Sequence, residues 1–224
     1  MPKTKFRLGF ETEEPDIDLE KFTKSLPSCF QVQTQENNIF ISLETSLEDD
    51  DNAKYLVDRE LDRHFFLTCV KITAEIVKRK ITNSFTSWYR IHGDLPEDIE
   101  PQVWNYELPI MLRLWSMAID LHSEFRLKIL YYFHIIELAY PEKSSYPDYT
   151  DYANPPHPLT ECKFIRHLVA HAGDVGGSQL KAYCRYLGIP EVMFDLTDRR
   201  YQAILLGKVY LLEQQAKKAI ENSL

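Results

Sequence analysis

Residues 29–43, CFQVQTQENNIFISL, decide the fold class of the first half of this chain. Two runs rich in β-branched and aromatic residues, 29–34 and 38–43, flank Glu36, Asn37 and Asn38, which are typical turn residues. The pattern therefore predicts a hairpin of two strands. Residues 5–10, KFRLGF, have a similar composition, and we expect them to join the same small sheet.

Helices are predicted between and after these strands. Residues 16–25 predict a short helix that ends before Pro27, and residues 53–79 predict a longer one because their apolar residues recur at mostly helical spacing. The acidic run at 48–51 suits the positive end of that helix better than a calcium loop. Residues 81–91, ITNSFTSWYRI, predict one further strand, which the Gly-Asp-Leu-Pro sequence at 93–96 ends.

From residue 96 onward the pattern is helical. Apolar periodicity predicts helices at 103–121, 124–140, 159–172, 178–187 and 197–222, which together suit a helical bundle. The segment 141–158 is rich in Pro and Tyr and long for a connector, so we expect it to be ordered by packing of its tyrosines or to act as a lid. The predicted class is α+β, with a small N-terminal α/β domain (1–95) of unknown role and a C-terminal all-α domain (96–224).

Composition and charge restrict the function. Hydrophobic residues make up 44% and charged residues 27% of the 224 positions, which excludes a disordered or collagen-like chain. The net charge of −8 argues against general attraction to nucleic-acid phosphates. Any nucleic-acid site must therefore be local, and Lys163, Lys181 and Arg185 in the more balanced C-terminal half are the candidate RNA-binding residues.

Targeting signals and cysteine usage favour a cytoplasmic protein. No signal-peptide pattern follows the N-terminal lysines, and no apolar run reaches the length of a membrane helix, so no membrane partner is expected. The four cysteines, at positions 29, 69, 162 and 184, form no Cys-x-x-Cys pair, which is typical of isolated reduced thiols.

Residues 164–173, FIRHLVAHAG, contain the candidate catalytic groups. On a regular helix His167 and His171 lie almost on one face, whereas Arg166 and His171 are about 140° apart. Gly173 is a natural helix terminator, which places His171 in the last turn. A helix-terminal histidine beside an arginine is a candidate acid–base group near neutral pH.

Two other interpretations of this segment remain open. The spacing His-Leu-Val-Ala-His also occurs in helical zinc pairs, but Leu168 stands where a zinc protease has glutamate, and a third ligand would have to come from Asp174, Cys162 or His157. Arg166 would also repel a dication, so we predict neither a metal nor another cofactor. The purely structural interpretation is a histidine that caps the helix and an arginine in a surface ion pair.

This segment resembles the motif of the HEPN superfamily, which is Arg-x4–6-His with Asn, Asp or His commonly following the arginine. The residues that match it are Arg166, the polar His167 and His171, on a predicted helix of a C-terminal helical domain. Residues 127–138, LKILYYFHIIEL, look like the earlier core helix of such bundles, which often carries an acidic residue facing the motif helix; Glu137 is the candidate. The resemblance covers about residues 100–222 and leaves the N-terminal domain unexplained.

The resemblance implies a homodimer in which two motif helices face each other across a composite cleft. It also implies a metal-independent endoribonuclease of a toxin–antitoxin, defence or RNA-processing system, with RNA and an antitoxin or other protein as partners. In that case His171 and Arg166 would carry the chemistry, His167 would assist and Glu137 would orient the site. The alternative is a catalytically inactive HEPN-like binding or dimerisation module. A tyrosine that is modified in one toxin subgroup is replaced by Gly173, so that regulation does not carry over.

Overall fold

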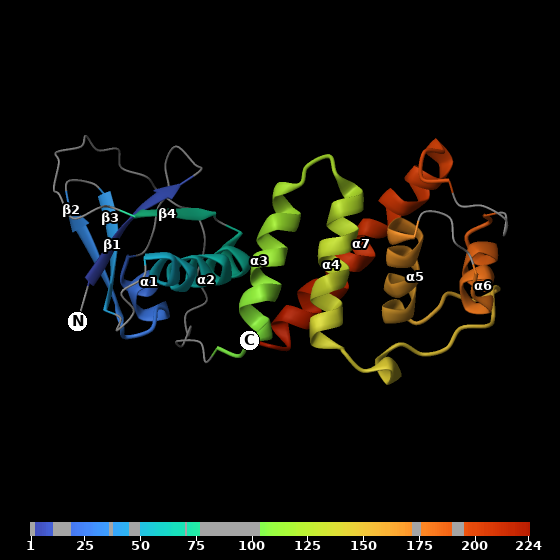
Figure 1. Cartoon of the computed structure of the whole chain (residues 1–224), viewed down its shortest axis with the longest axis horizontal. Helices are drawn as coiled ribbons and strands as arrows, with labels where there is room; N and C mark the ends of the chain where they lie inside the picture. The colour runs from blue at the N-terminus through green and yellow to red at the C-terminus, as the bar shows by residue number, and fades with distance from the viewer. Residues whose placement is uncertain are drawn as a thin grey trace. The chain divides into compact units, whose positions relative to one another are not determined.

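The computed structural model describes residues 3–10, 19–35, 38–44, 50–69, 71–76, 104–171, 176–189 and 195–224. The chain divides into two compact units, Met1–Asn105 and Tyr106–Leu224, which we describe separately. The described part of the first unit contains both strands and helices, and that of the second contains helices (Figure 1). The α+β class is therefore confirmed. The boundary predicted at residue 95 and the strand predicted at 81–91 lie outside the described residues.

The N-terminal unit follows a βαββαβ order. Its elements are β1 (Lys3–Phe10), α1 (Leu19–Ser25), β2 (Phe30–Gln35), β3 (Asn38–Glu44), α2 (Asp50–Thr68) and β4 (Ile72–Ile76). The sheet order is β2-β3-β1-β4, and each neighbouring pair is antiparallel. This is the arrangement of ferredoxin-like domains. It supports many unrelated activities, so by itself it indicates no function.

The predicted hairpin is confirmed as β2 and β3, whose pairing closes with Gln35 opposite Asn38. Alternate residues of these strands face the helices: Phe30, Ile41 and Leu43 are buried, whereas Gln31 is exposed. Since successive side chains of a strand point to opposite faces, this alternation gives the sheet one apolar face and one polar face. The apolar face packs in one core with Phe22, Leu26, Ala53, Val57 and Leu61 of the α1 and α2 region.

The predicted helix at 53–79 is wrong in its second half. α2 ends at Thr68, Cys69 adopts a left-handed backbone (φ 57°), and Ile72–Ile76 forms β4, which pairs with β1. Ile72 and Ile76 are four residues apart, a spacing that suits a helix face. Together with Ala74 they also fit the alternation of a strand, so the pattern alone could not distinguish the two.

A polar cluster holds residue 104 against α2. The Trp104 indole N–H donates to Glu60 Oε1 at 2.7 Å, and the Arg59 guanidinium lies 4.2 Å from the centre of the Trp104 ring. Arg59 and Arg63 are both ion-paired with Glu60, whose side chain is almost fully buried. Burial raises the pKa of Glu60, and the two arginines act against that shift. The cluster therefore attaches the end of this unit to its second helix.

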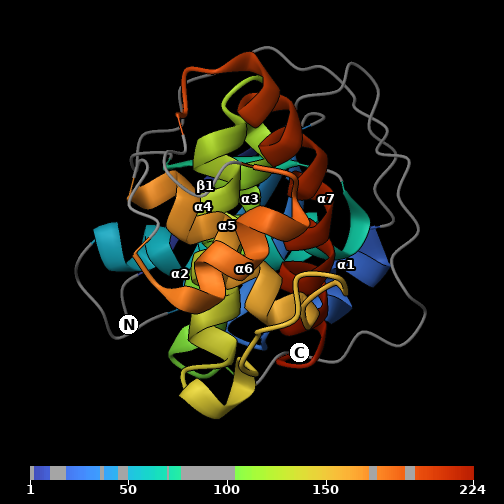
Figure 2. The same cartoon turned by 90° about the vertical axis from the view of Figure 1, so that its right-hand side faces the viewer.

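The C-terminal unit is helical in the part that the structure describes. Its elements are α3 (Glu107–Asp120), α4 (Phe125–Ala139), η1 (Lys143–Ser145), α5 (Pro158–Ala170), α6 (Ser178–Tyr186) and α7 (Arg199–Glu221). The five predicted helices are all present, with ends that differ by a few residues. α4 contacts α3, α5 and α7, and α6 lies outside α5 at one end of the unit (Figure 1, Figure 2). No helix among the described residues is long and apolar enough to span a bilayer.

Packing of tyrosines orders the connection between α4 and α5, as the sequence predicts. The Tyr149 ring is buried 6.2 Å from Phe164 of α5, and the Tyr149 hydroxyl donates to the carbonyl of Asn154. Gln179 of α6 accepts from the Tyr149 amide at 3.1 Å and donates to Asp148 at 2.7 Å. These contacts fix the connection to both α5 and α6.

Candidate functional site

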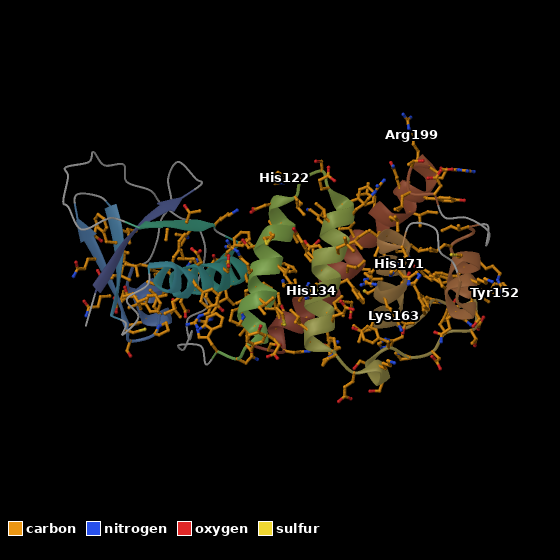
Figure 3. The ribbon with its side chains drawn as sticks, in the orientation of Figure 1. His122, His134, Tyr152, Lys163, His171 and Arg199 are labelled. Carbon is orange, nitrogen blue, oxygen red and sulfur yellow. The ribbon has the colours of Figure 1, made fainter. Side chains whose placement is uncertain are left out.

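The α5 helix carries the motif and has one apolar and one polar side. His157 caps its N-terminus by accepting from the Leu159 amide at 3.3 Å, and His171 is the C-terminal cap. Phe164, Ile165, Leu168 and Val169 are buried. The outer side consists of the exposed or half-buried residues Lys163, Arg166, His167, Ala170 and His171. Figure 3 shows His171 and Lys163 on this helix.

Arg166 and His171 lie close together. Arg166 Nη1 is 3.4 Å from His171 Nε2. A regular helix would separate these positions by about 140°. The cap residue departs from that geometry, since its backbone angles are φ −111° and ψ 15°. Because the chain leaves the helix at His171, its imidazole reaches the guanidinium.

His167 completes the group. Its ring centre is 4.5 Å from that of His171, as their spacing on one helical face predicts. The His171 amide donates to the carbonyl of His167 at 3.0 Å, which closes the last turn. The Arg166 guanidinium lies 5.8 Å from the ring centre of Phe133 on α4. The three polar side chains thus gather at one end of α5, above an aromatic ring.

No carboxylate of α5 opposes the positive groups on its outer side. The one acid of this helix, Glu161, is buried and faces α6 and α7. Its Oε1 accepts from Lys208 Nζ at 2.7 Å and from the Tyr183 hydroxyl at 2.9 Å. Burial, with the nearby Glu161 as the next cause, raises the pKa of Tyr183 well above its usual value. Within α5 itself, the outer side thus carries basic groups and no carboxylate, a composition that favours an anion such as a phosphate.

Glu137 does not touch the motif. It is exposed on α4, and no hydrogen bond or ion pair among the described residues joins it to Arg166 or His171. α4 and α5 run in opposite directions (Figure 1). Phe133 lies opposite Arg166, so Glu137, one turn later, lies further from His171. Burial and then the charge of Glu137 raise the pKa of Tyr146 to about 12, which places Glu137 near that ring.

Two aromatic residues near the cations were missed by the sequence reasoning. Phe133 lies beneath Arg166, and the ring centre of Tyr146 is 5.7 Å from Lys163 Nζ. The two aromatic rings are 6.3 Å apart. The spacing of Phe133 and Tyr146 in the sequence does not predict this arrangement, because Phe133 is on α4 and Tyr146 follows η1. Only the packing of the connection against α5 brings them under the basic side chains.

The other predicted RNA-binding residues are on α6. Lys181 is half-buried and Arg185 is exposed, and their spacing of four residues places them on one helical face. The Arg185 guanidinium lies 5.3 Å from the ring centre of Tyr152. Lys163 is on α5 itself, one turn before His167. The predicted basic residues are therefore divided between two adjacent helices rather than gathered at the motif.

The residues suggested for a zinc site do not converge. His157 is at the opposite end of α5, about 20 Å from His171 at 1.5 Å per residue. Cys162 is buried, which raises the pKa of its thiol, and Asp174 lies outside the described residues. Within the described ranges, no three His, Cys, Asp or Glu side chains are placed to hold a metal ion.

The residues that the structure brings together are thus Arg166, His167 and His171, with Lys163 on the same side of the helix. Comparison of the chain with protein-family models, with curated proteins and with solved structures finds no match. Interpretation of this site therefore depends on its own geometry and chemistry.

Proposed function

We propose that the C-terminal unit is a HEPN-like helical bundle and that the protein is a metal-independent endoribonuclease of a toxin–antitoxin, defence or RNA-processing system. The observation that supports this most directly is the 3.4 Å approach of Arg166 Nη1 to His171 Nε2 at the exposed end of α5. An imidazole can act as the general base and a guanidinium can stabilise charge on a phosphate, which are two of the functions that metal-independent cleavage of a ribose phosphodiester uses.

The contact suggests a role for each nitrogen. A guanidinium has no acceptor, so a hydrogen bond between these two groups requires Nε2 of His171 to carry the lone pair and accept. A ribose 2′-hydroxyl that takes the place of the guanidinium can give its proton to Nε2, and its oxygen then attacks the adjacent phosphorus. Arg166 stabilises the charge that develops on the phosphate oxygens. The 5′-oxygen leaves with a proton from a second imidazole, and a 2′,3′-cyclic phosphate remains.

The second imidazole is the reason for proposing a homodimer. His167 is only 4.5 Å from His171, on the same side of the scissile bond, whereas the leaving oxygen departs on the side opposite the attacking one. In a composite cleft the partner helix supplies a histidine on that other side. His167 then assists by holding the neighbouring ring. An antitoxin or another protein that covers the exposed outer side of α5 would block the reaction.

The alternative is the same bundle without catalysis, acting as a binding or dimerisation module. The net charge of −8 favours it, since most of this protein's surface field repels RNA. Within this chain the outer side of α5 carries Lys163, Arg166 and two histidines and no exposed carboxylate of that helix, so we expect an RNA to bind there first. An assay of cleavage distinguishes the two functions.

The test uses the purified full chain, mixed cellular RNA and EDTA. We expect cleavage that leaves 2′,3′-cyclic phosphate ends, detected by mass spectrometry. Arg166→Ala and His171→Ala should each lower the rate by about 100-fold or more, the usual contribution of an acid–base group or an electrostatic donor. His122→Ala is the matched control because His122 is exposed in the turn between α3 and α4 (Figure 3). Intact RNA, or equal cleavage by all variants, would exclude the proposed activity.

A further inference from the structure

An exposed aromatic side chain lies beside α6 and has no role in the proposed chemistry. Tyr152 is 53% exposed, and the Arg185 guanidinium covers one face of its ring at 5.3 Å from the centre. Figure 3 shows Tyr152 at the outer end of the C-terminal unit. A large aromatic ring that is half in solvent gains little from its own fold. Much of the Tyr152 side chain is therefore in solvent, where a planar ligand can reach it.

The backbone around Tyr152 is fixed on both sides. On one side, the Tyr149 side chain is buried and its backbone amide donates a hydrogen bond to Gln179. On the other, the Asp151 carboxylate accepts from the Ala153 amide at 2.9 Å and from the Asn154 side chain. Because the loop is already ordered, a ligand that stacks on the Tyr152 ring does not have to immobilise it. This preorganisation distinguishes Tyr152 from exposed aromatic residues on flexible segments.

The local charge favours a base over a phosphate. Asp148 and Asp151 lie in the same loop as Tyr152, and their carboxylates accept hydrogen bonds from neutral amide groups. Their negative charges lie close to Tyr152 in the sequence and disfavour a phosphate at its ring. A phosphate is better placed on the outer side of α5, where no carboxylate of that helix is exposed. A nucleobase has no charge, and its π-face can stack on a tyrosine that a guanidinium polarises.

We propose that Tyr152 and Arg185 form a subsite for one unpaired nucleobase of the same RNA strand, outside the nucleotides that are cleaved. The subsite rests on the proposed function, because it deepens recognition of the same substrate. The Tyr152 ring stacks on the base, and Arg185 holds the ring from behind. Lys181, one turn before Arg185 on α6, is placed to meet the phosphate next to that base. Tyr152 then contributes to substrate affinity and not to the chemical step.

The test measures binding without cleavage. The full chain carrying His171→Ala is titrated into a fluorescent single-stranded RNA of about twelve nucleotides, and the anisotropy gives Kd. Adding Tyr152→Leu should raise Kd by about 5- to 100-fold, whereas adding Tyr152→Phe should leave it within about twofold, because stacking needs the ring and not the hydroxyl. Tyr210→Leu is the control, since Tyr210 is 68% exposed on α7.

A second series replaces single nucleotides of the RNA with abasic ones. One abasic position should weaken binding to the His171→Ala protein but have no further effect once Tyr152→Leu is present. Equal Kd values for unmodified RNA with and without Tyr152→Leu would overturn the subsite alone. If the His171→Ala protein binds no RNA, the proposed function and the subsite both fail. Failure of the subsite alone is therefore distinguishable from failure of the proposed function.

Discussion

Replacement of Lys208 by Met tests how the motif helix is held in the bundle. The Lys208 and Glu161 side chains are 26% and 9% exposed, and their charged atoms are 2.7 Å apart. Loss of one partner of a fully buried pair costs about 3–5 kcal/mol, mainly because the other charge remains unpaired. Since Lys208 is partly in solvent, and Tyr183 still donates to Glu161, we expect Lys208→Met to lower the free energy of unfolding by about 2 kcal/mol.

A double variant, Lys208→Met with Glu161→Gln, tests this ion pair more directly than either single variant, because the sign of the coupling energy distinguishes an ion pair from independent packing effects. Glu161→Gln removes the carboxylate that Lys208→Met leaves unpaired, so the double variant should be more stable than Lys208→Met alone. Independent packing effects would instead add, and the double variant would be the least stable. Such additivity, or a loss below about 0.5 kcal/mol for Lys208→Met, would refute the reasoning.

The measurement is urea unfolding followed by fluorescence of Trp115, which is buried in α3, in a background where the other two tryptophans are Phe. Lys217→Met is the matched control, because Lys217 and Glu221 are about half exposed and 3.9 Å apart. An exposed pair of this kind contributes about 0–0.5 kcal/mol. A large effect of the control would show that methionine itself perturbs α7.

Three further predictions concern stability. The raised pKa of Tyr183 means that the folded state keeps its proton where the unfolded chain loses it. The contribution of Tyr183 to stability is therefore complete below about pH 10 and is lost as the pH rises further. Tyr183→Phe should reduce the alkaline decline in stability, measured by circular dichroism against pH. Tyr146→Phe should leave the free energy of unfolding unchanged or raise it by up to about 1 kcal/mol, because the Tyr146 hydroxyl is buried without a hydrogen bond to the described residues. A clear loss of stability in urea unfolding would contradict this. Cys69→Gly should stabilise the N-terminal unit by about 0.5 kcal/mol, since glycine adopts φ 57° without strain. Cys69→Val should destabilise the same unit, and thermal melts of both variants give the sign of each change in stability.

Local patterns in the sequence predicted most elements of the fold. The hairpin follows from the alternation around Asn37 and Asn38, and the five C-terminal helices follow from their apolar periodicity. The error after Thr68 has a local cause, since a left-handed cysteine gives no compositional signal of the kind that glycine gives. The pairing of β4 with β1 depends on residues far apart in the chain and could not be read from either segment.

The sequence indicated the segment that carries the candidate site but not its geometry. Regular helical geometry separates Arg166 from His171, and only the departure of the cap from that geometry joins them. Glu137 lies on α4, but the residue of α4 that faces Arg166 is Phe133. Which turn of α4 faces Arg166 depends on how the two helices pack and could not be predicted from the sequence. Tyr152 gave no signal, because its contact with Arg185 is formed by a long connection that folds back on α6.

The final turn of α5 would link the proposed cleavage reaction to local folding. The His171 N–H donates one hydrogen bond to the carbonyl of His167, and helix ends open at a small fraction of the free energy needed to unfold a domain. Each opening would carry the imidazole away from Arg166. A bound phosphodiester that engages both side chains would keep the turn closed, so the amide of His171 should exchange with deuterium more slowly in the presence of an uncleavable RNA analogue.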